Sequence, residues 1–199
     1  DRSPRLFKTL KKWFKSLPKT YSRPEIQVKF LSTIDLKFLE QELSFLETTV
    51  STLNCPIVFC HNDLLSANII YNPESKDVSF IDYEYGSFNY RSFDIANHFC
   101  EFAGFDCDYS QYPSLEAQRV WTHEYLTFFQ GHNGHVARED LDAVVKEVAV
   151  FTLAAHLFWG LWGLIQAQHS DIHFDYMGYA AARFTEYKTR KAALALLQE

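Results

Sequence analysis

The spacing of apolar residues predicts a mostly helical chain. In residues 6–17 and 36–53 they recur every three or four positions, which is the pattern of amphipathic helices. Asp35 directly precedes the second segment, and aspartate is a common helix N-cap. Residues 18–30 lack this periodicity, and we expect them to form a connector.

A different pattern occupies the middle of the chain. Three short apolar runs, at residues 57–60, 69–71 and 78–81, are separated by polar and turn-forming residues. Such runs predict short strands with polar loops at their ends. Between this region and the C-terminus we expect helices over residues 92–102, over about sixteen residues after Ser114, and over residues 138–170 and 176–188, with a loop at 132–135.

The predicted helix at 138–170 contains a mostly apolar stretch, residues 148–165, that is long enough to suggest a membrane span. His156, Gly160 and Gly163 interrupt it, and an amphipathic segment precedes it. A helix that is apolar all round is also typical of the centre of a helical domain. We therefore predict a buried core helix and no transmembrane segment.

Three polar residues lie at the ends of the predicted strands. Asp63 and Asn68 follow the first run at a spacing of five, and Asp82 follows the third run. Protein kinases carry a catalytic Asp, an Asn and a metal-binding Asp in the same order. The pattern predicts Asp63 as the base that takes the hydroxyl proton of the substrate. Asn68 and Asp82 are the predicted Mg²⁺ ligands, with ATP as the co-substrate.

Longer motifs surround this triplet. They are Cys-His-Asn-Asp-Leu-Leu at 60–65, Phe-Ile-Asp-Tyr-Glu-Tyr at 80–85 and Phe-Asp-Ile-Ala-Asn-His-Phe-Cys-Glu-Phe at 93–102. These motifs resemble those of the choline/ethanolamine kinase family. The resemblance continues through residues 155–162 and 176–179 to Arg183 and Phe184. It implies an α+β fold, the C-terminal lobe of a protein-kinase-like fold, mostly helical with a small β-hairpin at the catalytic loop.

The resemblance also implies a binding pocket for an ammonium group. Aromatic faces attract cations, and a carboxylate adds Coulomb stabilisation. The residues that match this pocket are Tyr85, Glu101, Trp159, Trp162 and Tyr179, whereas His61 and Asp94 match residues that hold the catalytic loop. A further aromatic found in choline kinases has no clear match, and Phe105 and Tyr109 are the candidates to replace it.

The residue chemistry alone does not decide between ethanolamine and choline. A quaternary nitrogen is best held by aromatic faces, whereas a primary ammonium needs hydrogen-bond acceptors, and both kinds of group are present. Segments 101–104 and 108–113 resemble ethanolamine kinases more closely. We therefore expect phosphorylation of ethanolamine as the first step of phosphatidylethanolamine synthesis. Choline kinase, an aminoglycoside-type phosphotransferase and a non-catalytic lobe are the alternatives.

Composition and net charge limit the expected number of domains, the classes of partner and the cellular compartment. A chain of 199 residues with 47% hydrophobic content suits one domain, and a net charge of −6 gives no reason to expect nucleic acid as a partner. The four cysteines lack a CxxC spacing, which favours a reducing cytoplasm over a disulfide framework. Homodimers occur in the family, so a homodimer is possible. Lysines line one face of the first predicted helix; we interpret this face as solvated, with an anionic membrane surface as the alternative.

No glycine precedes Gly86, and no lysine motif of the V-A-I-K kind is present. We therefore expect one domain over residues 1–199 that is the C-terminal lobe of a kinase, without the N-terminal nucleotide lobe. Residues 1–34 would form an opening helix and connector, and residues 35–199 the catalytic and substrate-binding core. By itself such a lobe is expected to have little or no activity.

Overall fold

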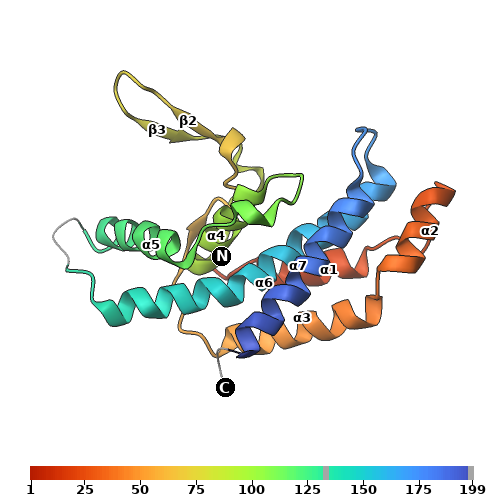
Figure 1. The fold of residues 1–199 in the computed structure, drawn as a ribbon, viewed down its shortest axis with the longest axis horizontal. Helices are drawn as coiled ribbons and strands as arrows, with labels where there is room; N and C mark the ends of the chain where they lie inside the picture. The colour runs from red at the N-terminus through yellow and green to blue at the C-terminus, as the bar shows by residue number, and fades with distance from the viewer. Residues whose placement is uncertain (132–134, 197–199) are drawn as a thin grey trace.

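The computed structural model describes residues 1–131 and 135–196 (Figure 1). The described residues form seven α-helices and four short β-strands. The helices are α1 (Leu6–Lys15), α2 (Pro24–Thr33), α3 (Leu36–Ser51), α4 (Arg91–Cys100), α5 (Leu115–Phe129), α6 (Arg138–His169) and α7 (Tyr176–Leu196). The strands are β1 (Ile57–Cys60), β2 (Ile69–Tyr71), β3 (Val78–Phe80) and β4 (Ser87–Tyr90).

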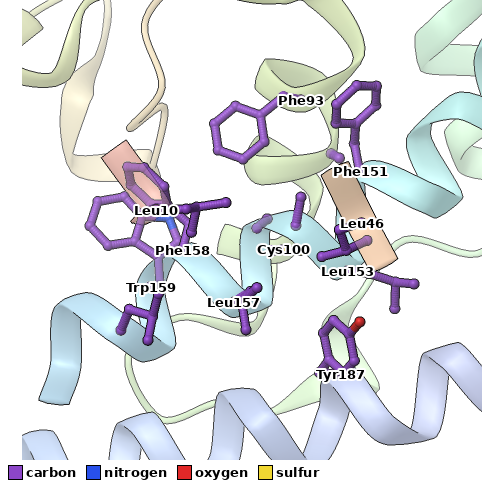
Figure 2. Close-up of a cluster of buried hydrophobic side chains, with 14 of the residues drawn as sticks. Leu10, Leu46, Phe93, Cys100, Phe151, Leu153, Leu157, Phe158, Trp159 and Tyr187 are labelled. Carbon is purple, nitrogen blue, oxygen red and sulfur yellow. The ribbon is translucent and has the colours of Figure 1, made fainter. Parts of the chain in front are cut away.

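Helix α6 forms the centre of the molecule. It packs against α7, α4, α5, α1 and α3, so it is covered on most sides (Figure 1). Helix α6 is long and apolar enough to cross a membrane, but 83% of its most apolar 18-residue segment is buried inside the protein. This burial is the arrangement expected for a core helix. Figure 2 shows Phe151, Leu153 and Leu157 of α6 among side chains from α3, α4 and α7.

Close contact between α6 and α7 depends on a glycine. The ring of Phe184 on α7 lies directly over Gly160, and a Cβ atom at that position would approach Phe184 Cε1 to 2.3 Å. Phe184 is itself buried. The two helices can therefore approach each other at this point only because residue 160 has no side chain.

The strands form two separate antiparallel pairs. In one pair β1 and β4 align Cys60 with Ser87, and this pair lies against α4. In the other, β2 and β3 form a hairpin that extends away from the helical body (Figure 1). The predicted hairpin at the catalytic loop is thus present, and β4 adds a second pair. Strand β4 was not predicted because its Ser-Phe-Asn-Tyr sequence has no continuous apolar run.

Two other predictions of secondary structure need correction. The predicted connector at 18–30 is wrong, because α2 occupies Pro24–Thr33. Proline in the first turn and an acidic Glu25 beside it favour a helix start, while the exposed Val28 and Leu31 hide the amphipathic pattern. Helix α7 continues beyond the predicted end at residue 188. The predicted loop at 132–135 falls almost entirely outside the described residues.

The predicted helix caps are confirmed. Asp35 accepts a hydrogen bond from the backbone N–H of Phe38, and Ser114 accepts one from that of Ala117. The four cysteines are all free thiols.

Candidate active site

The loop after β1 carries Asp63 in a tightly bonded turn. The carbonyl of Asp63 accepts hydrogen bonds from the backbone N–H of Leu65 at 3.0 Å and from Asn68 Nδ2 at 2.9 Å. Asn62, directly before Asp63, has a left-handed backbone with φ of 64°. Asparagine tolerates this conformation better than most residues. The turn fixes Asp63 and Asn68 relative to each other.

The end of β3 brings the second acid to the same place. The backbone N–H of Ile81 donates to the carbonyl of Asn68 at 3.1 Å, so Asp82 follows directly beside Asn68. Asp82 also has a left-handed backbone, with φ of 60°. Because the amide nitrogen of Asn68 is used within the loop, its Oδ1 is the atom left for a metal. An amide oxygen and a carboxylate fit Mg²⁺, which needs few protein ligands and keeps several waters.

The surroundings of Asp63 disfavour the charged form of its carboxyl group. Burial is the largest cause, and the neighbouring carboxylates of Glu101, Asp82 and Glu84 add to it, raising the pKa of Asp63 to about 7. A hydrogen bond from Asn68 acts in the opposite direction. A group with a pKa near the working pH is well matched to general-base catalysis.

Asp63 forms part of the wall of a small cavity. Its volume is about 90 Å³, well below the roughly 300–1,000 Å³ typical of pockets for drug-sized ligands. The wall combines three carboxyl groups with five aromatic side chains, and it includes every predicted amine-binding residue. The lining residues are Asp63, Leu65, Glu84, Tyr85, Glu101, Phe105, Trp159, Trp162 and Tyr179.

The aromatic walls pack against one another at steep angles. The rings of Trp159 and Trp162 meet edge to face with centroids 5.5 Å apart, and Tyr85 meets Trp159 in the same way at 5.4 Å. Phe105 lies 6.1 Å from Tyr179 and lines the cavity. Tyr109, the other candidate for the unmatched aromatic, instead packs against His156 and is not part of the lining. Of the two candidates for the unmatched aromatic, Phe105 is thus the one that lines the cavity.

An arginine outside the cavity wall contacts two of the lining residues. Arg183 Nη1 lies 3.4 Å from Glu101 Oε1 and donates to the hydroxyl of Tyr179 at 3.3 Å. Its Nη2 donates to the carbonyl of Ala155 on α6 at 3.2 Å. Arg183 thereby fixes both side chains from behind.

Helix α4 anchors the catalytic loop. Asp94 accepts hydrogen bonds from the backbone N–H groups of His61 at 2.9 Å and Asn62 at 2.7 Å. Burial nevertheless raises the pKa of Asp94, with these hydrogen bonds acting against it. His61 Nε2 donates to the carbonyl of Ile81 at 2.8 Å, which connects the loop to the segment that carries Asp82. His61 and Asp94 thus lie where residues that support the loop are expected.

Two buried asparagines, Asn62 and Asn97, were missed by sequence reasoning. Asn62 Nδ2 donates to the carbonyl of Tyr85 at 2.9 Å, and its Oδ1 accepts from Asn89 at 2.9 Å. Asn97 lies on α4 one turn after Asp94 and bonds to the loop and to Trp159. For Asn97 the sequence did contain a signal, because polar residues recur at a spacing of three, at Asp94 and Asn97, in a helix that is otherwise mostly apolar.

A larger cavity of about 320 Å³ is bounded by other residues of the same loop, His61 and Leu64. Its wall is mostly apolar and includes His61 and Asp94, but it contains neither Asp63 nor Asp82. Of these two cavities, the smaller one is thus the one whose wall contains Asp63, the predicted base.

Known proteins resemble this chain over most of its length. The family model described as "Choline/ethanolamine kinase" matches residues 1–188. Ethanolamine kinase 1 of Homo sapiens is 44% identical over 192 residues, which cover 94% of this chain and 42% of the human protein. The chain spans about half the length of the curated relatives that it matches.

Solved structures show the same similarity. The Plasmodium vivax ethanolamine kinase superimposes with a TM-score of 0.83 at 35% identity, covering 94% of this chain and 50% of that one. The choline kinase of Cryptosporidium parvum superimposes with a TM-score of 0.75 at 26% identity, covering 100% of this chain and 59% of that one.

Proposed function

Because the chain belongs to the choline/ethanolamine kinase family, we propose that the protein transfers the γ-phosphate of ATP to the hydroxyl of ethanolamine. The observation that carries this proposal is the cavity of about 90 Å³ in which Asp63 and Glu101 share a wall with aromatic rings. In this proposal Asp63 receives the hydroxyl nucleophile, and Glu101 with the aromatic rings receives the ammonium group. Ethanolamine has both groups, two carbons apart.

Each polar residue has a role in this proposal. Asp63 orients the hydroxyl and accepts its proton as phosphate transfer proceeds. Asn68 and Asp82 would hold Mg²⁺, and the bound ion would neutralise charge on the nucleotide phosphates. Asp94 and His61 keep the loop that carries Asp63 in place through the hydrogen bonds described above.

The small volume and the carboxylates of the cavity favour ethanolamine as the amine. Its ammonium group carries three N–H donors that need acceptors once water is removed. Glu101 and Glu84 supply such acceptors in the wall. Choline is the second candidate because five aromatic side chains surround the same space, and aromatic faces hold quaternary nitrogen well. An aminoglycoside is far too large for this cavity.

The test is ADP release by the full-length protein with Mg²⁺ and ATP, comparing ethanolamine with choline at equal concentrations. We expect kcat/KM to be at least about tenfold higher for ethanolamine, a difference of about 1.4 kcal/mol in transition-state stabilisation. Preference for choline would keep the mechanism and reject the amine. No ADP release with either amine would reject the function.

The control for this test is a pair of matched variants. Asp63→Asn keeps the size of the side chain but removes the base, and we expect kcat to fall by about 10²-fold or more. Asp140→Asn removes an exposed acid from the first turn of α6 and should leave turnover unchanged. Equal turnover in the Asp63→Asn variant and the unmodified protein would contradict the role of Asp63.

A further inference from the structure

The cavity of about 90 Å³ that receives the amine in the proposed function is named the amine cavity. Asn97 connects this cavity to the catalytic loop. Its Oδ1 accepts a hydrogen bond from Trp159 Nε1 at 2.6 Å, and its Nδ2 donates to the carbonyl of Asn62 at 3.1 Å. Asn97 is fully buried and does not line the cavity. Trp159 forms part of the cavity wall, and Asn62 directly precedes Asp63. One side chain amide therefore lies between the wall that faces the ammonium group and the peptide that carries the base.

The other side-chain hydrogen bonds between α4 and the catalytic loop involve only the backbone of that loop. Asp94 bonds the backbone of His61 and Asn62, and His98 Nδ1 donates to the carbonyl of Leu64 at 2.8 Å. These bonds fix the backbone on both sides of Asp63. Packing of α4 against α6, which carries Trp159, sets the general position of the loop relative to that helix. The bond from Asn97 to Trp159 adds a direct polar link between the loop and the indole ring in the cavity wall.

We propose that Asn97 is a positioning residue that sets the spacing between the ammonium end of the cavity and Asp63. This inference rests on the proposed function. The spacing selects amino alcohols with two carbons between nitrogen and oxygen, because only their hydroxyl reaches the base when the ammonium group is seated. Displacement of a reacting group by about 1 Å can cost about 10²-fold in rate. A substrate that is one methylene longer is therefore discriminated at the chemical step.

The chemistry of the amide makes the role specific to asparagine. Trp159 needs an acceptor and the carbonyl of Asn62 needs a donor, and the two ends of one amide satisfy both needs. Asn97→Asp keeps an acceptor for Trp159 but turns a second oxygen toward the carbonyl of Asn62. Asn97→Leu keeps the branching and the number of side-chain heavy atoms but has a larger volume, and it removes both bonds.

The chain contains a matched control for this position. Asn89 is also a buried asparagine bonded to Asn62, through Asn62 Oδ1 at 2.9 Å. Its Oδ1 accepts from the backbone N–H of Leu6 on α1, so it has no bond to the amine cavity. Asn89→Leu therefore removes an equivalent buried amide and loosens Asn62 without breaking the connection to Trp159.

The experiment compares ethanolamine with 3-amino-1-propanol as substrates of the full-length protein, using initial rates of ADP release. For Asn97→Asp and Asn97→Leu we expect kcat for ethanolamine to fall by about 10- to 100-fold, with KM changed less than about threefold. We expect the ratio of kcat/KM for ethanolamine to that for 3-amino-1-propanol to fall at least about tenfold. In Asn89→Leu that ratio should stay within about twofold of its original value.

The outcomes separate the two proposals. If the unmodified protein phosphorylates neither amino alcohol, the proposed function fails and the inference fails with it. If it phosphorylates ethanolamine but the ratio is the same in the Asn97 variants, or changes equally in Asn89→Leu, the positioning role is rejected. Should Asn97→Leu not fold, as judged by its thermal unfolding, Asn97→Asp decides alone, because its side chain has the same shape as that of asparagine.

Discussion

The ion pair between Arg183 and Glu101 combines two buried side chains, which are 1% and 9% exposed. Removing charges from water is costly, so such a pair adds little stability as a pair but becomes expensive to break. The geometry also gives the pair a local purpose, because Glu101 lines the amine cavity and Arg183 does not. The arginine holds the carboxylate where an ammonium group can meet it.

We therefore expect Arg183→Met to lower the free energy of unfolding of the chain by about 3–5 kcal/mol, since Glu101 would remain buried without its partner. Urea unfolding followed by circular dichroism measures this change. Adding Glu101→Gln to Arg183→Met should restore a substantial part of the loss, because it removes the unpaired charge. A double variant as unstable as Arg183→Met alone would contradict this explanation.

Arg183 also shows what a sequence motif leaves open at the scale of single residues. Its place in the motif was evident, but its partner Glu101 lies 82 residues away. Asn97 has the same property, because its partners lie 35 and 62 residues away. Asp63, Asn68 and Asp82 were easier to select because each follows an apolar run and their order carries a known chemistry. Their roles in this protein remain predictions, which the activity tests above address.

Among the secondary-structure elements, the long periodic helices were predictable and the short irregular ones were not. Helices α3, α5 and α6 have caps or sustained apolar patterns, and their bounds agree with prediction to within a few residues. Strand β4 exists because it pairs with β1, a long-range contact that leaves no local signal. Helix α2 was missed because Val28 and Leu31 are exposed, which removes the pattern of one apolar face.

The contact between α6 and α7 gives a prediction at the scale of helices. Alanine normally stabilises a helix relative to glycine by about 1 kcal/mol. At Gly160 we expect the opposite, because the added Cβ would lie 2.3 Å from Phe184 Cε1. Overpacking of this kind costs about 1–3 kcal/mol, so Gly160→Ala should lower the free energy of unfolding measured in urea.

A double-mutant cycle isolates the cause. In a background that already carries Phe184→Leu, the smaller side chain should reduce the cost of Gly160→Ala. An equal cost in both backgrounds would show that the Phe184 ring is not responsible.

For the whole molecule, the residues that line the cavity of about 90 Å³ come from four segments of the described chain: 63–85 between β1 and α4, 101–105 after α4, and helices α6 and α7. Under the proposed function, binding of the amine and turnover are separable, since turnover also needs the nucleotide to be held against the same site.

We therefore expect the chain of residues 1–199 by itself to bind ethanolamine, with little or no ADP release. A ligand of four heavy atoms can gain at most about 6 kcal/mol, so Kd should lie between about 0.05 and 10 mM. Isothermal titration calorimetry measures it, and Glu101→Gln should weaken binding at least about fivefold by removing a charge from the wall. Absence of binding by the folded chain up to tens of millimolar ethanolamine would contradict this prediction.

The placement of the tryptophans has a practical consequence for optical spectroscopy. The chain has four of them, and two, Trp159 and Trp162, form part of the cavity wall. Trp13 packs against Phe158 and Trp121 stacks with Tyr125, both outside the lining. Under the proposed function, an ammonium group that enters the cavity would change the electric field at two of the four indoles. The protein would then contain its own fluorescent reporter of occupancy, and amines could be compared without labels.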